Sequence, residues 1–223
     1  MEYSEGNVFV RNKPSQKLTW RELCFIAHKA YHKMPSGMEP GLQAQHVFQV
    51  PGGGVLPDAD MRVQIYPCFS FQAHVPYVEI DPATGHVSIL EYTIGHDCGT
   101  MINPMTLKGH VRGGVVNGIG STLLEHYHYD ENGQLQNALF TDYLLPSTLE
   151  SPPNMKVGHV VTPSPFTEYG IKGGGEGGRM GTPPALTSAI EDALKPLGIT
   201  IDELPLSPNR LRKLIRDAQS SHG

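Results

Sequence analysis

Apolar and polar residues alternate from Phe69 to Ile94, in the stretch FSFQAHVPYVEIDPATGHVSILEYTI. Alternation with a period of two is typical of a strand that buries one face. Two such runs flank the segment Asp81–Gly85, which consists of turn-forming residues and ends in glycine. The pattern therefore predicts a β-hairpin.

Two more stretches have the pattern of strands. In HYHYDENGQLQNALFTDY, the dipeptide Asn132-Gly133 separates an aromatic run from a mixed apolar run. Because Asn-Gly is a strong signal for a tight hairpin turn, we expect a second hairpin here. NMKVGHVVT, residues 154–162, is a further strand candidate.

A helix is predicted between the two hairpins. Apolar residues recur at every fourth position and form one stripe, Leu107, Val111, Val115, Ile119 and Leu123. The same segment contains five glycines, Gly109, Gly113, Gly114, Gly118 and Gly120. Each costs about 1 kcal/mol relative to alanine in a helix interior, so close approach to a neighbour must offset roughly 5 kcal/mol. We expect this helix inside a tightly packed assembly.

Two helices are predicted near the end of the chain. We expect Thr182 as the N-cap of the first, with Pro183-Pro184 in its first turn. Its apolar face includes Leu186, Ile190 and Leu194. The second is SPNRLRKLIRDAQ, with Ser207 as its cap.

The N-terminal third lacks a comparable pattern. A short periodic piece predicts one helix, about Trp20 to Met34, and the remainder is rich in chain breakers. We therefore expect a loop-rich region over residues 1–66 and one domain over residues 67–223. Strands and helices follow one another without a regular βαβ repeat, so the predicted fold class is α+β.

Composition excludes several classes of function. The net charge of -5 is spread along the chain, which gives no electrostatic footprint for nucleic acid or for an anionic membrane. No apolar run approaches the roughly 20 residues of a membrane span, and the first residues lack the apolar core of a signal peptide. Three separated cysteines favour neither a disulfide scaffold nor a thiolate metal site, and they fit a reducing cytoplasm.

One loop stands out for its chemistry. In the glycine loop, residues Gly173–Gly178, Glu176 is the only acid. The loop lacks the motif of a phosphate loop, and its acid would repel phosphate. A flexible linker is the alternative reading, although linkers seldom run directly into a capped helix. Glycines allow close approach of a bulky ligand, and a helix N-terminus and Arg179 both favour an ionised carboxylate. We interpret Glu176 as a candidate general base.

Histidine spacing does not predict a metal site. His126 and His128 are the closest pair among 11 histidines, and on a strand they would share one face. No third ligand has a recognisable spacing, so zinc is not expected. Glu125 and Asp142 are interpreted as surface or cap residues.

The motifs of residues 67–223, taken in order, resemble one family. They are HDCGTMINPMTLKGHVRGGVVNGIGSTLLEHYHYDENGQLQNALFTDYLLP, VVTPSPFTEYGIKGGGEGG and TPPALTSAIEDAL, with GMEPGL near Gly37 in addition. They are similar to the C-terminal part of the molybdenum-binding subunit of the xanthine dehydrogenase family. That family includes aldehyde oxidoreductases, aerobic carbon monoxide dehydrogenases and hydroxylases of nitrogen heterocycles. The resemblance implies the C-terminal half of a molybdopterin-binding domain, with mixed sheets and packed helices.

The resemblance also implies a role for the lone acid. In relatives, the glutamate of a Gly-Glu pair in this loop lies beside molybdenum and acts as the base, and the matching residues are Gly175 and Glu176. Glu176 would then deprotonate a molybdenum-bound hydroxyl, which attacks an electrophilic carbon while hydride moves to a sulfido or equivalent ligand. Electrons would leave through iron–sulfur clusters and FAD on other subunits.

Two positions depart from the family pattern. The residue two before the glutamate is often a larger aliphatic one, and Gly174 is expected to open or loosen the pocket. A Gly-Gln pair whose glutamine contacts the pterin in relatives reads Gly109-His110, so His110 is expected to replace that contact. The candidate cofactor-binding residues are therefore Gly174, Gly175, Gly109 and His110.

The upstream segments that hold the pterin in relatives, a Gly-Gln-Gly loop and a serine-rich stretch, do not occur in these 223 residues. We therefore expect a split catalytic subunit, with a larger molybdopterin-holding partner, an iron–sulfur subunit and a flavin subunit; a truncated form of a longer subunit is the alternative. Three other hypotheses stay open: a non-catalytic structural subunit, a carbon monoxide dehydrogenase-type member, and a binding module that uses the glycine loop as an anion nest. These residues do not fix the substrate.

Overall fold

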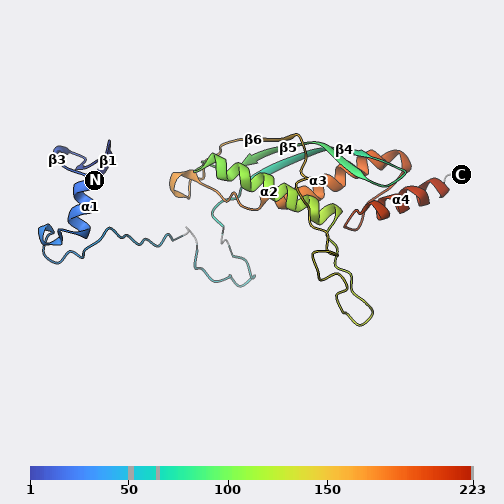
Figure 1. Cartoon of the computed structure of the whole chain (residues 1–223), viewed down its shortest axis with the longest axis horizontal. Helices are drawn as coiled ribbons and strands as arrows, with labels where there is room; N and C mark the ends of the chain where they lie inside the picture. Colours follow the sequence, from blue (N-terminus) through green and yellow to red (C-terminus); the bar gives the residue numbers. More distant parts are fainter. Residues whose placement is uncertain (50–52, 64–65, 222–223) are drawn as a thin grey trace. The chain divides into compact units, whose positions relative to one another are not determined.

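The computed structural model describes residues 1–49, 53–63 and 66–221. The chain forms two compact units, Met1–Gln49 and Val50–Gly223, and each unit contains one three-stranded sheet (Figure 1). The sequence prediction placed the division later, between residues 66 and 67, shortly before regular alternation begins at Phe69.

The first unit is a small antiparallel sheet followed by a short helix. Its strands are β1 (Glu2–Ser4), β2 (Asn7–Val10) and β3 (Lys13–Thr19), in that order. Helix α1 (Trp20–His28) begins with a capping box between Thr19 and Glu22, and the short 3-10 helix η1 (Tyr31–Lys33) follows.

Two expectations for this region need correction. The helix ends at His28, not at Met34, because Tyr31–Lys33 form a separate 3-10 turn. The segment before the helix is a sheet, not a loop. Its strands have only 3 to 7 residues and bury none of them fully, so they leave no alternating pattern in the sequence.

The predicted hairpin forms the main sheet of the second unit. Strands β4 (Phe71–Ile80) and β5 (Val87–Asp97) are antiparallel, with Phe71 opposite Asp97 at the open end. Strand β6 (Met155–His159) pairs in parallel with β5 on its other side, which confirms the strand expected within residues 154–162. β5 is therefore the central strand.

The second predicted hairpin is wrong. Gly133 does adopt a turn conformation, with a φ of 77°, and its N–H donates to the Asp130 carbonyl. Beyond the turn, only the single bridge between Tyr129 and Leu135 forms, and residues 124–150 run as a long loop (Figure 1). Most of the flanking side chains are exposed, so neither strand gains a buried face to stabilise it.

Two long helices cover the face of the sheet that carries the buried side chains of β5. Helix α2 (Pro104–Leu123) confirms the predicted helix, and its stripe buries Val111, Val115 and Ile119. Helix α3 (Gly177–Leu194) lies beside it and is followed by the short helix η3 (Lys195–Leu197) and by α4 (Pro208–Ser221) (Figure 1). The core side chains come from β5, from these helices and from the turn before α4: Tyr92, Ile94, Val111, Val115, Ile119, Leu186, Ile190, Leu194, Leu206, Leu211 and Ile215.

The start of α3 differs from the prediction. The helix begins at Gly177, so Thr182 and both prolines lie inside it and Thr182 is not the N-cap. The Thr182 hydroxyl is fully buried, where it donates to the Gly178 carbonyl (2.7 Å) and accepts from the Tyr92 hydroxyl (3.0 Å). Tertiary packing of the glycine-rich first turns thus outweighs the local capping preference of Thr182.

The glycines of α2 serve two different purposes. A Cβ added at Gly118 would lie 2.5 Å from the Thr182 Cβ, and one added at Gly114 would lie 2.9 Å from the Arg179 nitrogen. These two confirm the expected close approach to a neighbouring helix. Gly109 and Gly113, in contrast, have nothing within 4 Å of an added Cβ, so packing within this chain does not explain them.

Within the described ranges, none of the helices combines the length and the apolar character that crossing a lipid bilayer requires.

Candidate functional site

Glu176 occupies the N-cap position of α3, directly after three glycines. Its carbonyl oxygen accepts hydrogen bonds from the N–H groups of Arg179 and Met180, both at 3.0 Å, so the main chain at Glu176 is fixed to the helix. Its exposed side chain makes no capping hydrogen bond. The main chain at Glu176 is thus fixed at the N-terminus of a helix, and the exposed carboxylate projects from that point.

A hollow of about 550 Å³ lies beside this carboxylate, between the first half of α2 and the start of α3. We refer to it as the Glu176 hollow. Its lining residues are Met105, Thr106, Gly109, His110, Gly113, Gly114, Asn117, Gly175, Glu176 and Arg179. The fold therefore brings together four of the five residues that the sequence singled out, from two segments more than 60 positions apart.

Gly174 is the predicted site residue that does not line the Glu176 hollow. A Cβ added at Gly174 would lie 2.8 Å from Leu107 Cδ1 and 3.5 Å from Cys98 Cβ. Absence of a side chain at this position thus lets the glycine loop lie against the end of β5.

Asn117 is a lining residue that the sequence reasoning missed. Its Oδ1 accepts a hydrogen bond of 2.6 Å from Arg179 Nε. The sequence spacing could have identified Asn117, because Gly109, Gly113 and Asn117 are spaced by four and must share one helical face. That face is distinct from the apolar stripe of α2.

A layer of buried and half-buried polar side chains lies beneath the first turns of α3. His74 Nδ1 lies 3.0 Å from the Tyr92 hydroxyl, and burial raises the pKa of Tyr92 to about 12. Cβ atoms added at Gly177 and Gly181 would overlap Gln72 and His74. Glycine at these positions therefore allows the helix that carries Glu176 to lie directly on the sheet.

His96 is a fully buried member of this layer, with 1% of its surface exposed. Burial lowers its pKa, and the neighbouring His159 lowers it further. Neither ring nitrogen has a hydrogen-bond partner within the described part of the chain. His96 is accordingly a neutral imidazole at pH 7.

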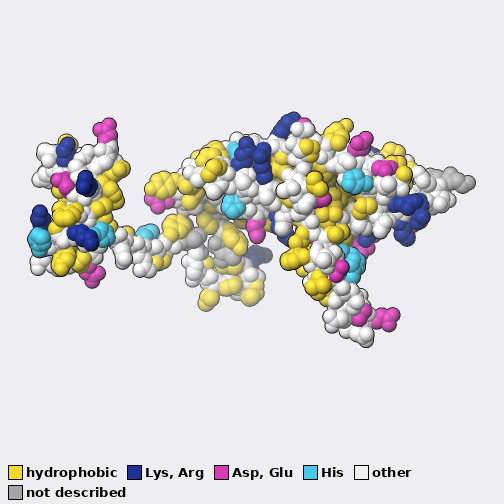
Figure 2. Space-filling model, viewed as in Figure 1, with side chains coloured by type: hydrophobic (Ala, Val, Ile, Leu, Met, Phe, Trp, Pro, Cys, Tyr) yellow, Lys and Arg dark blue, Asp and Glu magenta, His cyan; other side chains and the backbone are white. Residues whose placement is uncertain are grey.

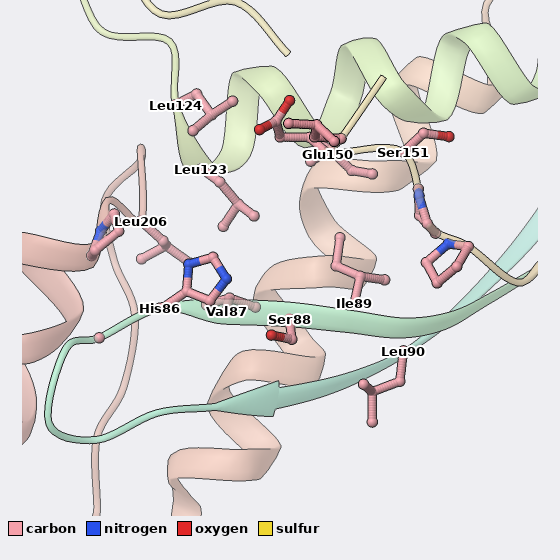
Figure 3. A pocket seen from close by; sticks show the side chains of 16 residues that line it. His86, Val87, Ser88, Ile89, Leu90, Leu123, Leu124, Glu150, Ser151 and Leu206 are labelled. Atoms are coloured by element: carbon pink, nitrogen blue, oxygen red, sulfur yellow. The ribbon is translucent and has the colours of Figure 1, made fainter. Parts of the chain in front are cut away.

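A second hollow of about 370 Å³ lies at the other end of α2, against the start of β5 (Figure 3). Its lining is mostly apolar and includes Ile89, Leu123 and Leu206. The carboxylate of its one acid, Glu150, accepts hydrogen bonds from the N–H and hydroxyl of Ser147. We favour the Glu176 hollow as the functional site, because the Glu176 side chain makes no capping hydrogen bond of this kind.

His126 and His128 lie in the loop after α2, with ring centroids 4.3 Å apart. In the part of the chain that the structure describes, no three His, Cys, Asp or Glu side chains are grouped to hold a metal ion.

Comparison with known proteins gives consistent matches. A family model described as a molybdopterin cofactor-binding domain matches residues 1–152, which extends the likeness over the N-terminal region where only GMEPGL had suggested it. The nicotine 6-hydroxylase large subunit of Paenarthrobacter nicotinovorans is 38% identical over 179 residues, which is 80% of this chain and 20% of that protein. The carbon monoxide dehydrogenase large chain of Hydrogenophaga pseudoflava is 33% identical over 198 residues, 89% of this chain and 23% of that one.

Solved structures agree with these matches. The quinoline 2-oxidoreductase of Pseudomonas putida 86 superimposes with a TM-score of 0.75 and 33% identity, over 97% of this chain and 26% of that chain. A Cu,Mo-containing carbon monoxide dehydrogenase superimposes with a TM-score of 0.76 and 29% identity, over 98% of this chain and 25% of that chain. The 223 residues thus span about a quarter or less of the relatives that they match.

Proposed function

Because this chain belongs to the molybdopterin cofactor-binding domain family of xanthine dehydrogenase-type molybdenum enzymes, with the α+β fold that its motifs predicted, we propose that it supplies the catalytic base of a molybdenum hydroxylase. The observation that carries the proposal is the shared position of Glu176 with Gly109, His110 and Gly175 around one hollow. A carboxylate beside an open, glycine-lined surface is suited to take a proton from a reactant held there.

The residues around the Glu176 hollow fit a molybdopterin cofactor. Cβ atoms added at Gly109, Gly113 and Gly175 would meet nothing within 4 Å, so these glycines leave a cradle that side chains would fill. Gly109 and Gly113, which are exposed on α2, cost about 2 kcal/mol in helix propensity. Close approach of the flat pterin ring to the main chain would offset that cost. We propose that Gly109, His110 and Gly175 hold the pterin, with the His110 ring as its hydrogen-bond partner.

When bound, the cofactor supplies a Lewis-acidic metal that accepts two electrons. We propose that this chain holds the proton acceptor, the Glu176 carboxylate, at a fixed place. Among the described residues none forms an ion pair with Glu176, and Arg179 Nε is held by Asn117. Within the described residues, neither Arg179 nor any other cation is therefore paired with the Glu176 carboxylate. We propose that it takes the proton of a water-derived nucleophile as that nucleophile attacks the substrate carbon.

We propose that polypeptide beyond these 223 residues completes the site. We propose a larger molybdopterin-holding partner, together with an iron–sulfur subunit and a flavin subunit that carry the electrons away. Large apolar side chains exposed on the loop after α2 support a docking role (Figure 2): Tyr127, Tyr129, Leu139, Phe140, Leu144, Leu145 and Leu149. Exposed apolar surface of this kind is typical of a permanent subunit interface.

The substrate we propose is a small organic molecule oxidised at carbon, with oxygen that comes from water. Two relatives are named for nicotine and quinoline, which favours a nitrogen heterocycle. Carbon monoxide oxidation is the second candidate, since relatives named carbon monoxide dehydrogenase large chain match at 33% and 31% identity.

We expect the native complex that contains this chain to carry molybdenum in stoichiometric amount. The measurement is elemental analysis of the purified complex, with the chain expressed without partners as a control that should carry none.

Turnover is then assayed with quinoline, nicotine and carbon monoxide in water enriched in heavy oxygen. Heavy oxygen in a hydroxylated heterocycle supports the first candidate, and activity with carbon monoxide alone supports the second. A complex without molybdenum contradicts both.

A further inference from the structure

We propose that the buried ion pair between Asp97 and Lys172 positions Glu176. Lys172 is the last residue before the glycines of the glycine loop, and Asp97 is the last residue of β5. The inference rests on the proposed role of Glu176 as a base. It assigns a positioning role to two residues that do not line the Glu176 hollow.

Glu176 needs fixing from both sides because three successive glycines precede it. Gly173, Gly174 and Gly175 have no side chains to pack, and glycine has more main-chain freedom to lose than any other residue. On the C-terminal side, the hydrogen bonds from Arg179 and Met180 tie the Glu176 carbonyl to α3. The remaining freedom must be removed on the N-terminal side.

Lys172 supplies that second attachment. Its main-chain N–H donates to the Cys98 carbonyl at 2.8 Å, and its Nζ donates to Asp97 Oδ2 at 3.1 Å. The two side chains are only 7% and 12% exposed. The ammonium group also lies 5.6 Å from the centroid of the Phe71 ring, on the neighbouring strand. The residue before the glycines is therefore anchored by main chain and side chain at once.

Asp97 in turn connects three segments of the chain. Its Oδ1 accepts from the Gly99 N–H at 2.8 Å and from the Thr162 N–H at 3.2 Å, while Oδ2 accepts from Lys172. The Gly99 N–H, with the Thr162 and Lys172 hydrogen bonds, holds the pKa of the Asp97 carboxyl well below its usual range. The carboxylate is thus charged at neutral pH and links the end of β5 to both of the other segments.

On energetic grounds, we assign the Asp97–Lys172 ion pair the role of fixing the geometry of the loop and not that of stabilising the fold. A buried ion pair must offset the desolvation of two charges, and a well-packed apolar pair is often as stable or more stable. What the ion pair adds is one defined geometry, because the ammonium must lie where the carboxylate is. A more exposed ion pair, Lys156 with Glu91 at 2.7 Å, joins β6 to β5, and neither residue lines the Glu176 hollow. It provides a matched control.

The test removes both charges together, so that neither is left buried alone. In the purified complex, Asp97→Asn/Lys172→Met is compared with Glu91→Gln/Lys156→Met. Amide hydrogen exchange in peptides that cover residues 170–180 is measured by mass spectrometry, and kcat and KM are measured in parallel. We expect faster exchange across Gly173–Gly178 and a kcat lower by about 10- to 100-fold with KM nearly unchanged, because a small displacement of a catalytic group costs about this much. The control pair should change neither.

Loop exchange and kcat at the parental level in the Asp97→Asn/Lys172→Met complex would overturn the inference. A single Lys172→Arg change keeps the positive charge and is expected to retain most of the exchange protection, which a purely steric role of Lys172 would not predict. Glu176→Gln in the same complex separates this inference from the proposed function. If that variant turns over normally, the base assignment fails, and the exchange measurement still decides whether the ion pair fixes the loop.

Discussion

Replacement of Glu176 by glutamine is expected to lower kcat by about 10² to 10⁴-fold, the usual contribution of a general base. The amide has the shape of the carboxylate but cannot accept the proton. The side chain is exposed and makes no capping hydrogen bond, so the fold and the molybdenum content should stay at the parental level. Steady-state kinetics, normalised to molybdenum measured by elemental analysis, provide the check.

Glu168→Gln is the matched control for this experiment. Glu168 is also an exposed acid, in the 3-10 helix η2 (Glu168–Gly170), and it does not line the Glu176 hollow. Its replacement should leave kcat unchanged. Parental activity of the Glu176→Gln complex would favour the alternative of a non-catalytic structural subunit. Loss of molybdenum in that variant would instead assign Glu176 to cofactor binding.

Periodicity predicted those elements whose faces are buried evenly along their length. The β4–β5 hairpin, the stripe of α2 and the Leu186, Ile190 and Leu194 face of α3 all form as expected. Prediction failed where long-range contacts decide. The Asn132-Gly133 turn forms without flanking strands to bury, and Thr182 is engaged by Tyr92, 90 positions earlier in the sequence, so that it does not cap α3.

The candidate site likewise combines residues that the sequence predicts with residues that only long-range contacts identify. Glu176 follows from its place as the lone acid of the glycine loop, whereas Gly175, Gly109 and His110 follow from a family resemblance in linear motifs; the fold gathers all four around one hollow. Asp97 and Lys172 are separated by 75 positions, and neither belongs to a spacing pattern that would pair them. Only the fold reveals a contact of that kind, because it depends on β5 ending where the glycine loop begins.

Gly178→Ala is expected to be the most damaging of the glycine substitutions for the contact between α2 and α3. The added Cβ would overlap the carbonyl oxygen of Val111 and would lie 3.1 to 3.2 Å from two further main-chain atoms of that residue. Main chain cannot turn aside as a side chain can, so the helices must separate. Overpacking of this kind costs about 1 to 3 kcal/mol, which lowers the thermal midpoint by about 3 to 10 °C in a chain of this size.

Gly113→Ala is the matched comparison, because it lies on α2 of the same helix pair but has nothing within 4 Å of an added Cβ. Here the methyl group should raise helix stability by up to about 1 kcal/mol and keep or raise the thermal midpoint. The same methyl group would project into the Glu176 hollow, so we expect less molybdenum in the purified complex. Thermal unfolding and elemental analysis of both variants therefore separate two reasons for glycine in one helix pair. If Gly113→Ala retained full molybdenum, the cradle would not be the cofactor site, whereas an unchanged midpoint for Gly178→Ala would contradict the close packing of α2 on α3.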